Sequence, residues 1–335
     1  MINNNTIISQ IGNTPLIKLK KISELTGCDI YGKAEFLNPG QSIKDRTALK
    51  IIEEAEQRKS IEKGGLIVEG TAGNTGIGLS IVGNAKGYKT KIIIPNTQSE
   101  EKKNTLRSYG AELIEVPAVP YSDKNNYQHI AKRIAEDDIK NNPNGAIFAD
   151  QWNNLDNIKA HYDHTGPEIW ENTNGRINGF VCSIGTGGTI VGVSNYLNEQ
   201  NKDIKIAVAD PLGASMYNYF KNNNIIATDG NSISEGIGLG RVTPIIKEAK
   251  NVDFSYLIDD HTALPYIYDL VVNEGIILGG SSAINIAGAV KLAKELGPGH
   301  TIVTILCDSG SRYQSKLYNK KFLKSKDISI PAWMV

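Results

Sequence analysis

The chain has 335 residues, of which 40% are hydrophobic and 33 are glycine, a composition typical of a globular protein with one large domain or two ordinary ones. Lys and Arg number 36, as do Asp and Glu, and this zero formal net charge argues against a nucleic-acid partner. The apolar runs are too short to span a membrane, and the first residues lack the basic flank and apolar core of a signal peptide. The three cysteines are far apart and form neither a disulfide framework nor a zinc motif. We therefore expect a soluble, cytoplasmic protein without membrane, nucleic-acid or metal partners.

Short apolar runs alternate with segments of helical spacing along most of the chain. Most runs are hydrophobic at successive positions, as in strands covered on both faces, and this alternation predicts mostly parallel sheets. Helices are predicted after Thr47, Ser99 and Ser282, and Gly12–Lys21 is expected to be an extended arm. The predicted strands are residues 65–70, 91–95, 112–116, 146–150, 179–185, 204–210 and 301–308. These units are too many for one small sheet, so we expect an α/β fold with two lobes and a boundary near residues 141–157, where Asn, Pro and Gly concentrate.

Three glycine-rich stretches each follow a predicted strand and lead into a helix: residues 70–78, 185–189 and 279–282. Ligands bind at this position in open parallel sheets, beyond the carboxyl ends of the strands. Glycine allows positive φ and a close approach to a phosphate or carboxylate, which then meets backbone N–H groups. The alternative, that these glycines only form tight turns, stays open for each loop taken singly.

Common nucleotide and hydrolase motifs are not matched. The P-loop pattern is absent, and Ile190 stands where the dinucleotide pattern starting at Gly185 requires glycine. Residues 279–283 lack the final glycine of the hydrolase elbow. His161 and His164 have no third ligand nearby in sequence and are interpreted as ordinary structural histidines.

Lys44 lies in the segment Asn38–Arg46, between a Pro-Gly turn and a predicted helix. For an arbitrary lysine, a solvated position is the ordinary interpretation. A lysine able to form a Schiff base, a separate phosphate loop and a cleft between two α/β lobes together indicate a pyridoxal-phosphate enzyme.

The chain resembles the fold-type II pyridoxal-phosphate enzymes, specifically the cysteine synthase and cystathionine β-synthase family. The matching motifs occur in the family's order between residues 11 and 313, and they are IGNTPLIKL, NPGQSIKDR, GTAGNTGIGL, ADQW, GTGGT, EGIG, GGSS and CDSGSRY. The resemblance implies a tryptophan synthase β-like fold, in which two open, mostly parallel-sheet lobes enclose the active site in the cleft between them. It also implies a larger cofactor-binding lobe of residues 1–41 plus 152–335 and a smaller, mobile lobe of residues 42–151.

The family's functional residues carry over to the matching positions of this chain. Lys44 is then expected to hold the cofactor, pyridoxal 5'-phosphate, as an internal aldimine and to act as the catalytic base. Asn74 is expected to hydrogen-bond the cofactor's ring hydroxyl, and Ser281 to face its pyridine nitrogen. The expected phosphate cup consists of Gly185, Thr186, Gly187, Gly188 and Thr189. The expected substrate-carboxylate site consists of Thr71, Gly73, Asn74, Thr75 and Gln151.

The chemistry that the resemblance implies is β-replacement through an α-aminoacrylate, to which a sulfur nucleophile adds. We expect a cysteine synthase, which converts O-acetylserine and sulfide to cysteine and acetate, and a homodimer, as is usual in the family. One alternative is a β-synthase that uses serine or cysteine and forms cystathionine or releases hydrogen sulfide. Another is a catalytically silent regulatory paralogue, against which the intact Lys44 and phosphate cup argue.

Two positions leave the expected chemistry open. Ala72 stands where the family usually has a serine that contacts the substrate. We favour a neutral replacement over altered substrate choice, because a lost neutral hydrogen bond costs only about 1 kcal/mol. Arg241, which follows the EGIG motif, either meets an anionic substrate or product or pairs with a surface carboxylate.

Overall fold

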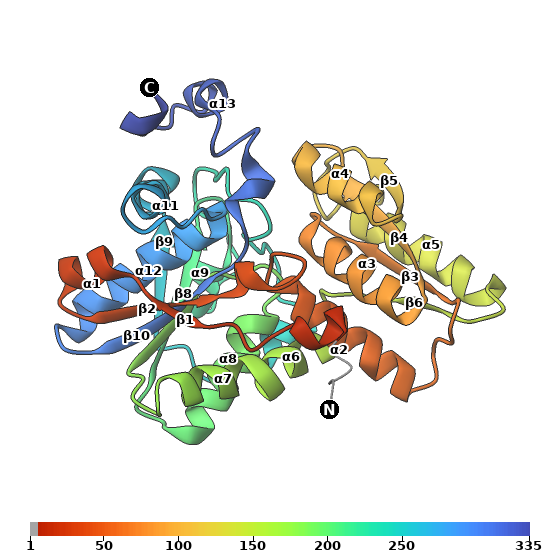
Figure 1. Ribbon diagram of the computed structural model, residues 1–335, viewed down its shortest axis with the longest axis horizontal. Helices are drawn as coiled ribbons and strands as arrows, with labels where there is room; N and C mark the ends of the chain where they lie inside the picture. Colours follow the sequence, from red (N-terminus) through yellow and green to blue (C-terminus); the bar gives the residue numbers. More distant parts are fainter. Residues whose placement is uncertain (1–5) are drawn as a thin grey trace.

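The computed structural model describes residues 6–335 and contains two separate sheets (Figure 1). The strands are β1 Leu16–Lys18, β2 Asp29–Ala34, β3 Leu66–Gly70, β4 Lys89–Pro95, β5 Glu112–Val116, β6 Ala146–Phe148, β7 Gly179–Cys182, β8 Lys205–Pro211, β9 Phe254–Ile258 and β10 Thr301–Leu306. The smaller sheet has the order β5–β4–β3–β6 and is parallel throughout. The larger has the order β1–β2–β10–β7–β8–β9 and is parallel except for β1, which runs antiparallel to β2. The predicted α/β class with two lobes is confirmed.

Helices cover both faces of each sheet. They are α1 Lys20–Thr26, α2 Lys44–Gln57, α3 Asn74–Lys86, α4 Glu100–Ser108, α5 Tyr127–Asn141, α6 Asp156–Ala160, α7 Gly166–Asn172, α8 Gly188–Gln200, α9 Met216–Asn222, α10 Pro244–Lys247, α11 Asp260–Glu274, α12 Gly280–Leu296 and α13 Lys320–Ser325. In the smaller lobe, α5 packs against β3 and β6, whereas α3 packs against β4. Helix α2 packs in turn against α3. In the larger lobe, α12 crosses the central strands on one face, and α8 packs behind β7.

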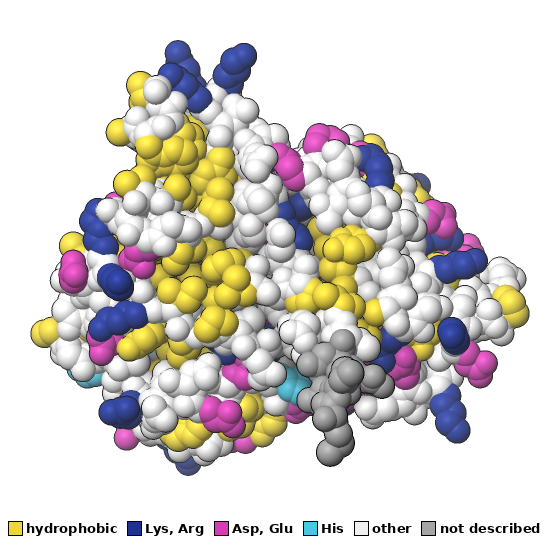
Figure 2. All heavy atoms as spheres, in the orientation of Figure 1, with side chains coloured by type: hydrophobic (Ala, Val, Ile, Leu, Met, Phe, Trp, Pro, Cys, Tyr) yellow, Lys and Arg dark blue, Asp and Glu magenta, His cyan; other side chains and the backbone are white. Residues whose placement is uncertain are grey.

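Charged side chains of both signs are interspersed over the face of the molecule shown in Figure 2. This distribution agrees with the equal numbers of acidic and basic residues. None of the helices in residues 6–335 is long and apolar enough to cross a membrane.

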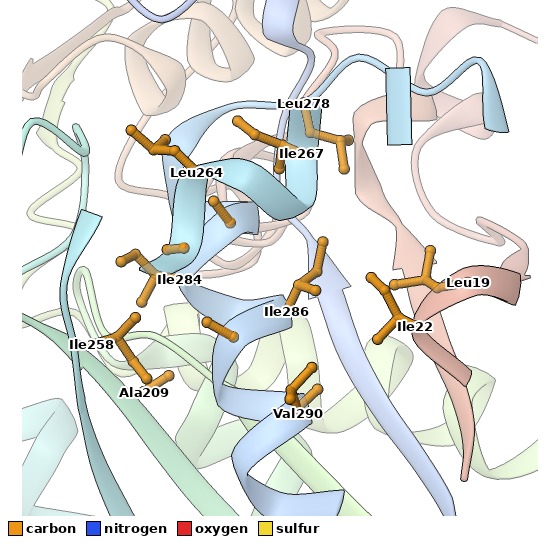
Figure 3. Close-up of a cluster of buried hydrophobic side chains, with 14 of the residues drawn as sticks. Leu19, Ile22, Ala209, Ile258, Leu264, Ile267, Leu278, Ile284, Ile286 and Val290 are labelled. Carbon is orange, nitrogen blue, oxygen red and sulfur yellow. The ribbon is translucent and has the colours of Figure 1, made fainter. Parts of the chain in front are cut away.

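The larger sheet separates two hydrophobic cores, which explains why its strands are apolar at successive positions. One core lies between the sheet and the layer of α11 and α12, where Leu264 and Ile267 meet Ile284 and Ile286 (Figure 3). The other lies under α8 and includes Phe180. Because the strands are covered on both faces, each carries buried side chains in both directions.

Three strands and one loop connection differ from the sequence prediction. Strand β1 forms within the predicted extended arm, and the sequence did not predict β2 and β9. Gly32 and the fully buried Lys33 interrupt the apolar run in β2; Lys33 is accommodated because its ammonium pairs with Glu168 at 2.7 Å. The prediction that the glycines at 279–282 follow a strand is wrong, because the preceding element is α11.

The helix that carries Lys44 lies between the two lobes. In α2, Ala48, Ile51, Ile52 and Ala55 are buried, a spacing that forms one apolar stripe on a helix. This helix packs against α3 of the smaller lobe and α6 of the larger lobe. All strands of the smaller sheet lie within residues 66–148, so the chain returns to the larger lobe through the predicted Asn-rich segment.

Asp210, at the end of β8, is a fully buried carboxyl group with incomplete hydrogen bonding. Its Oδ2 accepts from the Tyr217 N–H at 2.8 Å, whereas its Oδ1 has no partner among residues 6–335. Burial raises the pKa of Asp210 to about 7. The folded protein therefore holds this proton at pH values where the unfolded chain has already lost it.

A raised carboxyl pKa removes stability as the pH increases from the unfolded to the folded value. We predict that the free energy of unfolding of Asp210→Asn, relative to the wild type, increases by about 3 kcal/mol between about pH 5 and pH 8. Urea denaturation at both pH values measures this change. The exposed Asp203→Asn serves as the control and should show no such trend; an equal trend in both variants would contradict the assignment.

Candidate active site

Strands of both sheets end at one cavity of about 1140 Å³ between the lobes. In the smaller lobe, Thr71 follows β3 and Gln151 follows β6, and both line the cavity. In the larger lobe, Ser183 follows β7, Asp259 follows β9 and Cys307 follows β10, and these residues line it as well. The carboxyl ends of parallel strands are where ligands bind in α/β folds, so this cavity is the candidate active site.

Residues predicted from distant parts of the sequence meet in this cavity. Those that line it are Lys44, Thr71, Asn74, Thr75, Gln151, Gly185, Thr186, Gly187, Thr189 and Ser281. Gly73 and Gly188 do not line it; Gly73 is the N-cap of α3, and Gly188 is the first residue of α8. Ala72 and Arg241 line the same cavity.

Lys44 reaches the cavity from the first position of α2. The preceding segment is tied to the end of β10, because the Ile43 N–H donates to the Cys307 carbonyl oxygen at 2.9 Å. Among residues 6–335, no hydrogen bond or ion pair engages the Lys44 Nζ. Burial lowers the pKa of this ammonium group. A lowered pKa increases the fraction of neutral amine, which is the form that acts as a nucleophile or base.

The predicted phosphate cup connects β7 to α8 and is built from glycines that leave no room for side chains. A Cβ at Gly185 would collide with the Gly236 carbonyl oxygen, and Gly187 has a φ of +99°. The N-cap residue of α8 is Gly187, which has no side chain to accept from the first N–H groups of this 13-residue helix, so these groups are left for another acceptor. A helix N-terminus of this kind, behind a glycine cradle, is suited to an anion such as a phosphate.

Two uncharged side chains face the cavity from neighbouring elements, Ser281 at the start of α12 and Cys307 directly after β10. The Asn285 Nδ2 donates to the Cys307 Sγ at 3.2 Å. Burial, followed by the nearby Asp308 carboxylate, raises the pKa of Cys307 to about 11. The thiol therefore stays neutral at ordinary pH, and Ser281 offers the cavity a neutral hydroxyl.

Asn74 is held from both sides by residues that follow β10. Its Nδ2 donates to the Asp308 Oδ2 at 2.7 Å, and its Oδ1 accepts from the Arg312 Nη1 at 2.6 Å. The Tyr313 hydroxyl donates to the same Asp308 oxygen at 2.6 Å. These bonds fix the orientation of the amide and connect the two lobes across the cavity.

The glycine loop after β3 is positioned by its neighbours in the smaller lobe. The Thr75 hydroxyl donates to the Gln151 Oε1 at 2.5 Å, which links two of the predicted carboxylate-binding residues. With its amide turned to satisfy both partners, Gln98 donates to the Ala72 carbonyl oxygen at 3.0 Å and to the Glu235 Oε2 at 2.9 Å. Ala72 is therefore fixed through its backbone.

A buried ion pair also links the lobes beside this loop. The Lys102 Nζ, on α4, lies 2.7 Å from the Glu235 Oε2, and Lys316 pairs with the other Glu235 oxygen. Lys102 is only 1% exposed and lies 4.4 Å from the centre of the Tyr313 ring. Burial alone would raise the pKa of Glu235, but Lys102 and Lys316 together lower it. A Cβ at Gly73 would lie 2.8 Å from the Lys102 Cδ, so the glycine loop rests on this lysine.

Arg241 meets aromatic side chains instead of a surface carboxylate. Its guanidinium lies 3.8 Å from the centre of the Tyr121 ring and 5.3 Å from the Trp152 ring, and it donates to the Gln128 Oε1 at 3.0 Å. Among residues 6–335, no ion pair engages it. The structure therefore places an unneutralised cation at the cavity wall.

Sequence reasoning missed Lys102, Asp308, Arg312 and Tyr313 as parts of the site. The last three belong to the CDSGSRY motif, which contributed to the family resemblance without a role for any of its residues. Lys102 gave no signal, because a lysine in a charged helix turn is ordinarily solvated. Within residues 6–335, no three His, Cys, Asp or Glu side chains form a metal-binding group.

Comparisons with known proteins agree with this geometry. The family model described as "Pyridoxal-phosphate dependent enzyme" matches residues 7–308. The chain is 46% identical to cysteine synthase 1 of Neurospora crassa over 321 residues, which cover 95% of this chain and 84% of the relative. A hydrogen sulfide-producing enzyme from Fusobacterium nucleatum superposes with a TM-score of 0.81 at 34% identity, covering 92% of this chain and 99% of the other. An O-acetylserine dependent cystathionine beta-synthase from Helicobacter pylori gives 0.82 at 32% identity, covering 94% and 99%.

The Lys102–Glu235 pair generates a stability prediction. Removing one member of a buried ion pair leaves an uncompensated charge, so Lys102→Met should lower the free energy of unfolding by about 3 kcal/mol or more. The exposed pair of Lys132 and Glu136 provides the control, and Lys132→Met should cost less than about 1 kcal/mol. Urea denaturation measures both, and equal losses would show that the buried pair has no special role.

Proposed function

This chain belongs to the family of pyridoxal-phosphate dependent enzymes, and from that premise we propose that it is a cysteine synthase that exchanges the acetate of O-acetylserine for sulfide. One observation carries the proposal: the unpaired Lys44 amine and a glycine cradle for phosphate line the same cavity. The cysteine synthase relatives, at 46% and 43% identity for two of them, support this choice of reaction.

The residues present fit pyridoxal phosphate. The glycines of the cup would clash with neighbouring atoms if they carried a Cβ, and this close packing leaves their N–H groups for a phosphate. Lys44 would hold the cofactor covalently, Gly185–Thr189 would bind its phosphate, and Ser281 would meet its ring nitrogen. Asn74, fixed by Asp308 and Arg312, would hydrogen-bond the ring hydroxyl.

When bound, pyridoxal phosphate supplies an electron-withdrawing ring that stabilises negative charge at the α-carbon of an amino acid. The Lys44 amine removes the α-proton, a role for which its lowered pKa keeps it in the neutral form. Ser281 presents a neutral hydroxyl, which does not enforce a charge on the ring nitrogen. The residues Thr71 to Thr75 and Gln151 hold the substrate's carboxylate, and the contacts of Asn74 and Lys102 across the cavity exclude water.

We further propose that the four-stranded sheet and its helices within residues 42–151 move as one lobe against residues 1–41 plus 152–335, with α2 as the connection that the ion pairs of Arg46 with Glu35 and Glu168 hold to the larger lobe. The separation of the two sheets supports these limits, and so does the small set of polar contacts that connects Asn74 and Lys102 to the larger lobe. Substrate bound at the glycine loop would draw the lobes together.

A cytoplasmic homodimer is the proposed form of the enzyme. The free thiols of Cys28, Cys182 and Cys307, as expected in a reducing compartment, support the location. A shallow apolar hollow lined by Ile7, Pro39 and Tyr109, beside Leu37 with 53% exposure, supports a protein contact on that side.

A visible absorbance titration of the purified holoenzyme tests the proposed reaction. We predict that O-acetylserine shifts the band of the lysine-bound cofactor, that sulfide restores it, and that serine and cysteine have little effect. Lys44→Ala should lose both the band and turnover, because Lys102 and Lys316, which also line the cavity, are held in ion pairs with Glu235. A shift with serine or cysteine would instead indicate a cystathionine-forming or sulfide-releasing enzyme. No band after addition of pyridoxal phosphate would indicate a catalytically silent paralogue.

The Arg241 environment favours a second candidate function, the use of an amino-acid thiol in place of sulfide. The guanidinium has no carboxylate partner, and the 1140 Å³ cavity has room for a nucleophile much larger than sulfide. A charged hydrogen bond to the carboxylate of such a thiol would contribute about 1.5–3 kcal/mol. The product with homocysteine would be cystathionine.

We predict that Arg241→Met raises the KM for homocysteine at least about tenfold if the thiol is a substrate, because the variant removes the cation. The kcat/KM for sulfide, which has no carboxylate, should change far less. Steady-state assays with each nucleophile and O-acetylserine measure both values. If the wild type forms no cystathionine, or if both nucleophiles lose efficiency equally, the second candidate function is wrong.

A further inference from the structure

A buried polar side chain lies behind the phosphate cup and touches neither the cavity nor solvent. It is Asn157 on α6, which is 1% exposed and is not among the residues that line the cavity. Its Nδ2 donates to the Gln151 carbonyl oxygen at 2.8 Å and to the Thr186 hydroxyl at 2.8 Å. Its Oδ1 accepts from the Thr47 hydroxyl at 3.0 Å. Both donors of the amide and one of its two acceptor positions are thus in use.

The three partners of Asn157 belong to three different parts of the site. Thr186 lies in the phosphate cup, and Gln151 lies at the proposed carboxylate site. Thr47 lies on α2, almost one turn after Lys44. The Asn157 amide therefore connects helix α2, which carries Lys44, to the phosphate cup and to Gln151 of the smaller lobe.

The bond to Gln151 determines the direction of the other two. A backbone carbonyl oxygen only accepts, so the amide must present its Nδ2 to Gln151 and Thr186 and its Oδ1 to Thr47. The Thr186 hydroxyl accepts from Asn157, and its own proton is consequently available for an acceptor in the cavity. A hydroxyl aimed in this way is ready to donate to a phosphate oxygen.

His161 holds the other end of the cup in the same network. Its Nε2 lies 3.3 Å from the Thr189 hydroxyl and 3.4 Å from the Thr47 hydroxyl, and its Nδ1 lies 3.0 Å from the Thr165 hydroxyl. Burial lowers the pKa of His161 well below its ordinary value, so the imidazole is neutral and can accept as well as donate. The residue stands at the start of a π-helical turn, His161–Thr165, a distortion that is frequent at functional sites.

Two glycines on one face of α8 allow this network to form. A Cβ at Gly188 would collide with the Asn157 Oδ1, and a Cβ at Gly192 would lie 2.7 Å from the His161 Cβ. The two positions are four residues apart and so share one side of the helix. Helix α8 can therefore pack against Asn157 and His161 only because glycine stands at both of these positions.

Resting on the proposed function, we propose that Asn157 is a positioning residue that couples the cofactor-phosphate cup to the substrate-carboxylate site and to the lysine helix. It acts through the proton direction of Thr186 and through the backbone of Gln151. Its loss should weaken cofactor binding and substrate binding together, although it touches neither ligand.

The test uses Asn157→Asp, which keeps the size and the acceptor for Thr47 but replaces the two-donor amide. The carboxylate turns the Thr186 proton away from the cup, so the dissociation constant of the holoenzyme for pyridoxal phosphate should rise at least about tenfold. Equilibrium dialysis of the holoenzyme measures it. The KM for O-acetylserine should rise as well, since Gln151 loses a hydrogen bond.

The matched control is Asn195→Asp, at another buried asparagine, whose Nδ2 donates to the Glu248 carbonyl oxygen at 3.2 Å away from the cup. We expect it to lower the free energy of unfolding but to leave the cofactor dissociation constant within about twofold of the wild type. An equal change in both variants would overturn the proposal, because it would indicate a general loss of packing. In a Thr186→Val background, Asn157→Asp should have little further effect on the cofactor dissociation constant. A full effect in that background would also overturn the proposal.

If Asn157→Asp does not fold, Thr47→Val and Thr47→Ser decide the question. Valine removes the donor to the Asn157 Oδ1, and serine keeps it. The cofactor dissociation constant should rise at least about threefold with valine and return to near the wild-type value with serine. An unchanged value with valine would overturn the proposal. Failure of the wild type to bind pyridoxal phosphate would instead overturn the proposed function itself.

Discussion

The site depends on the hydrogen bonds that the carboxylate of Asp308 accepts. Asp308 is 1% exposed and accepts hydrogen bonds from Asn74 of the smaller lobe and from Tyr313 of the C-terminal segment. Its backbone forms a bridge with Ser42, two residues before Lys44. Three chain segments that are far apart in sequence therefore meet at one residue directly after β10. Because Asp308 follows a central strand of the larger sheet, the rigid part of the molecule positions both the lysine and the glycine loop.

Buried ion pairs recur around the active site. Arg46, two residues after Lys44, is fully engaged by Glu35 and Glu168, and Lys33 pairs with Glu168 as well. Such groups gain little net stability, since desolvation offsets most of their attraction, but removal of one partner is costly. Their effect here is geometrical: they fix α2 against β2 and α7, so that Lys44 enters the cavity in one orientation. Neutral groups, in contrast, face the place proposed for the cofactor ring.

The polar layer behind the phosphate cup extends this principle to hydrogen bonds. Asn157 and His161 are buried without charge. Asn157 sets the proton direction of the Thr186 hydroxyl, and His161 forms hydrogen bonds with neighbouring hydroxyl groups. Gly188 and Gly192 are needed for that contact, so a glycine outside the cavity contributes to the site as much as those inside it. Through Asn157, the small helix α6 thus connects the proposed phosphate site, the proposed carboxylate site and the helix that carries Lys44.

The sequence by itself determined the parallel α/β lobes, and ten of its twelve predicted site residues line the cavity. Strands covered on both faces produce unbroken apolar runs such as Ile92–Pro95. The glycine loops can be recognised in the sequence because a close backbone approach requires glycine. Only the tertiary structure decided the rest. The sequence did not predict strand β2 because its buried Lys33 is compensated by the distant Glu168. The role of Lys102 depends on Glu235, and that of Asn157 depends in part on Thr47 and Thr186, all more than twenty residues away. The local sequence pattern predicts whether a residue is buried. It does not show which distant group forms the hydrogen bond or ion pair with a buried polar atom, and these pairings specify the site.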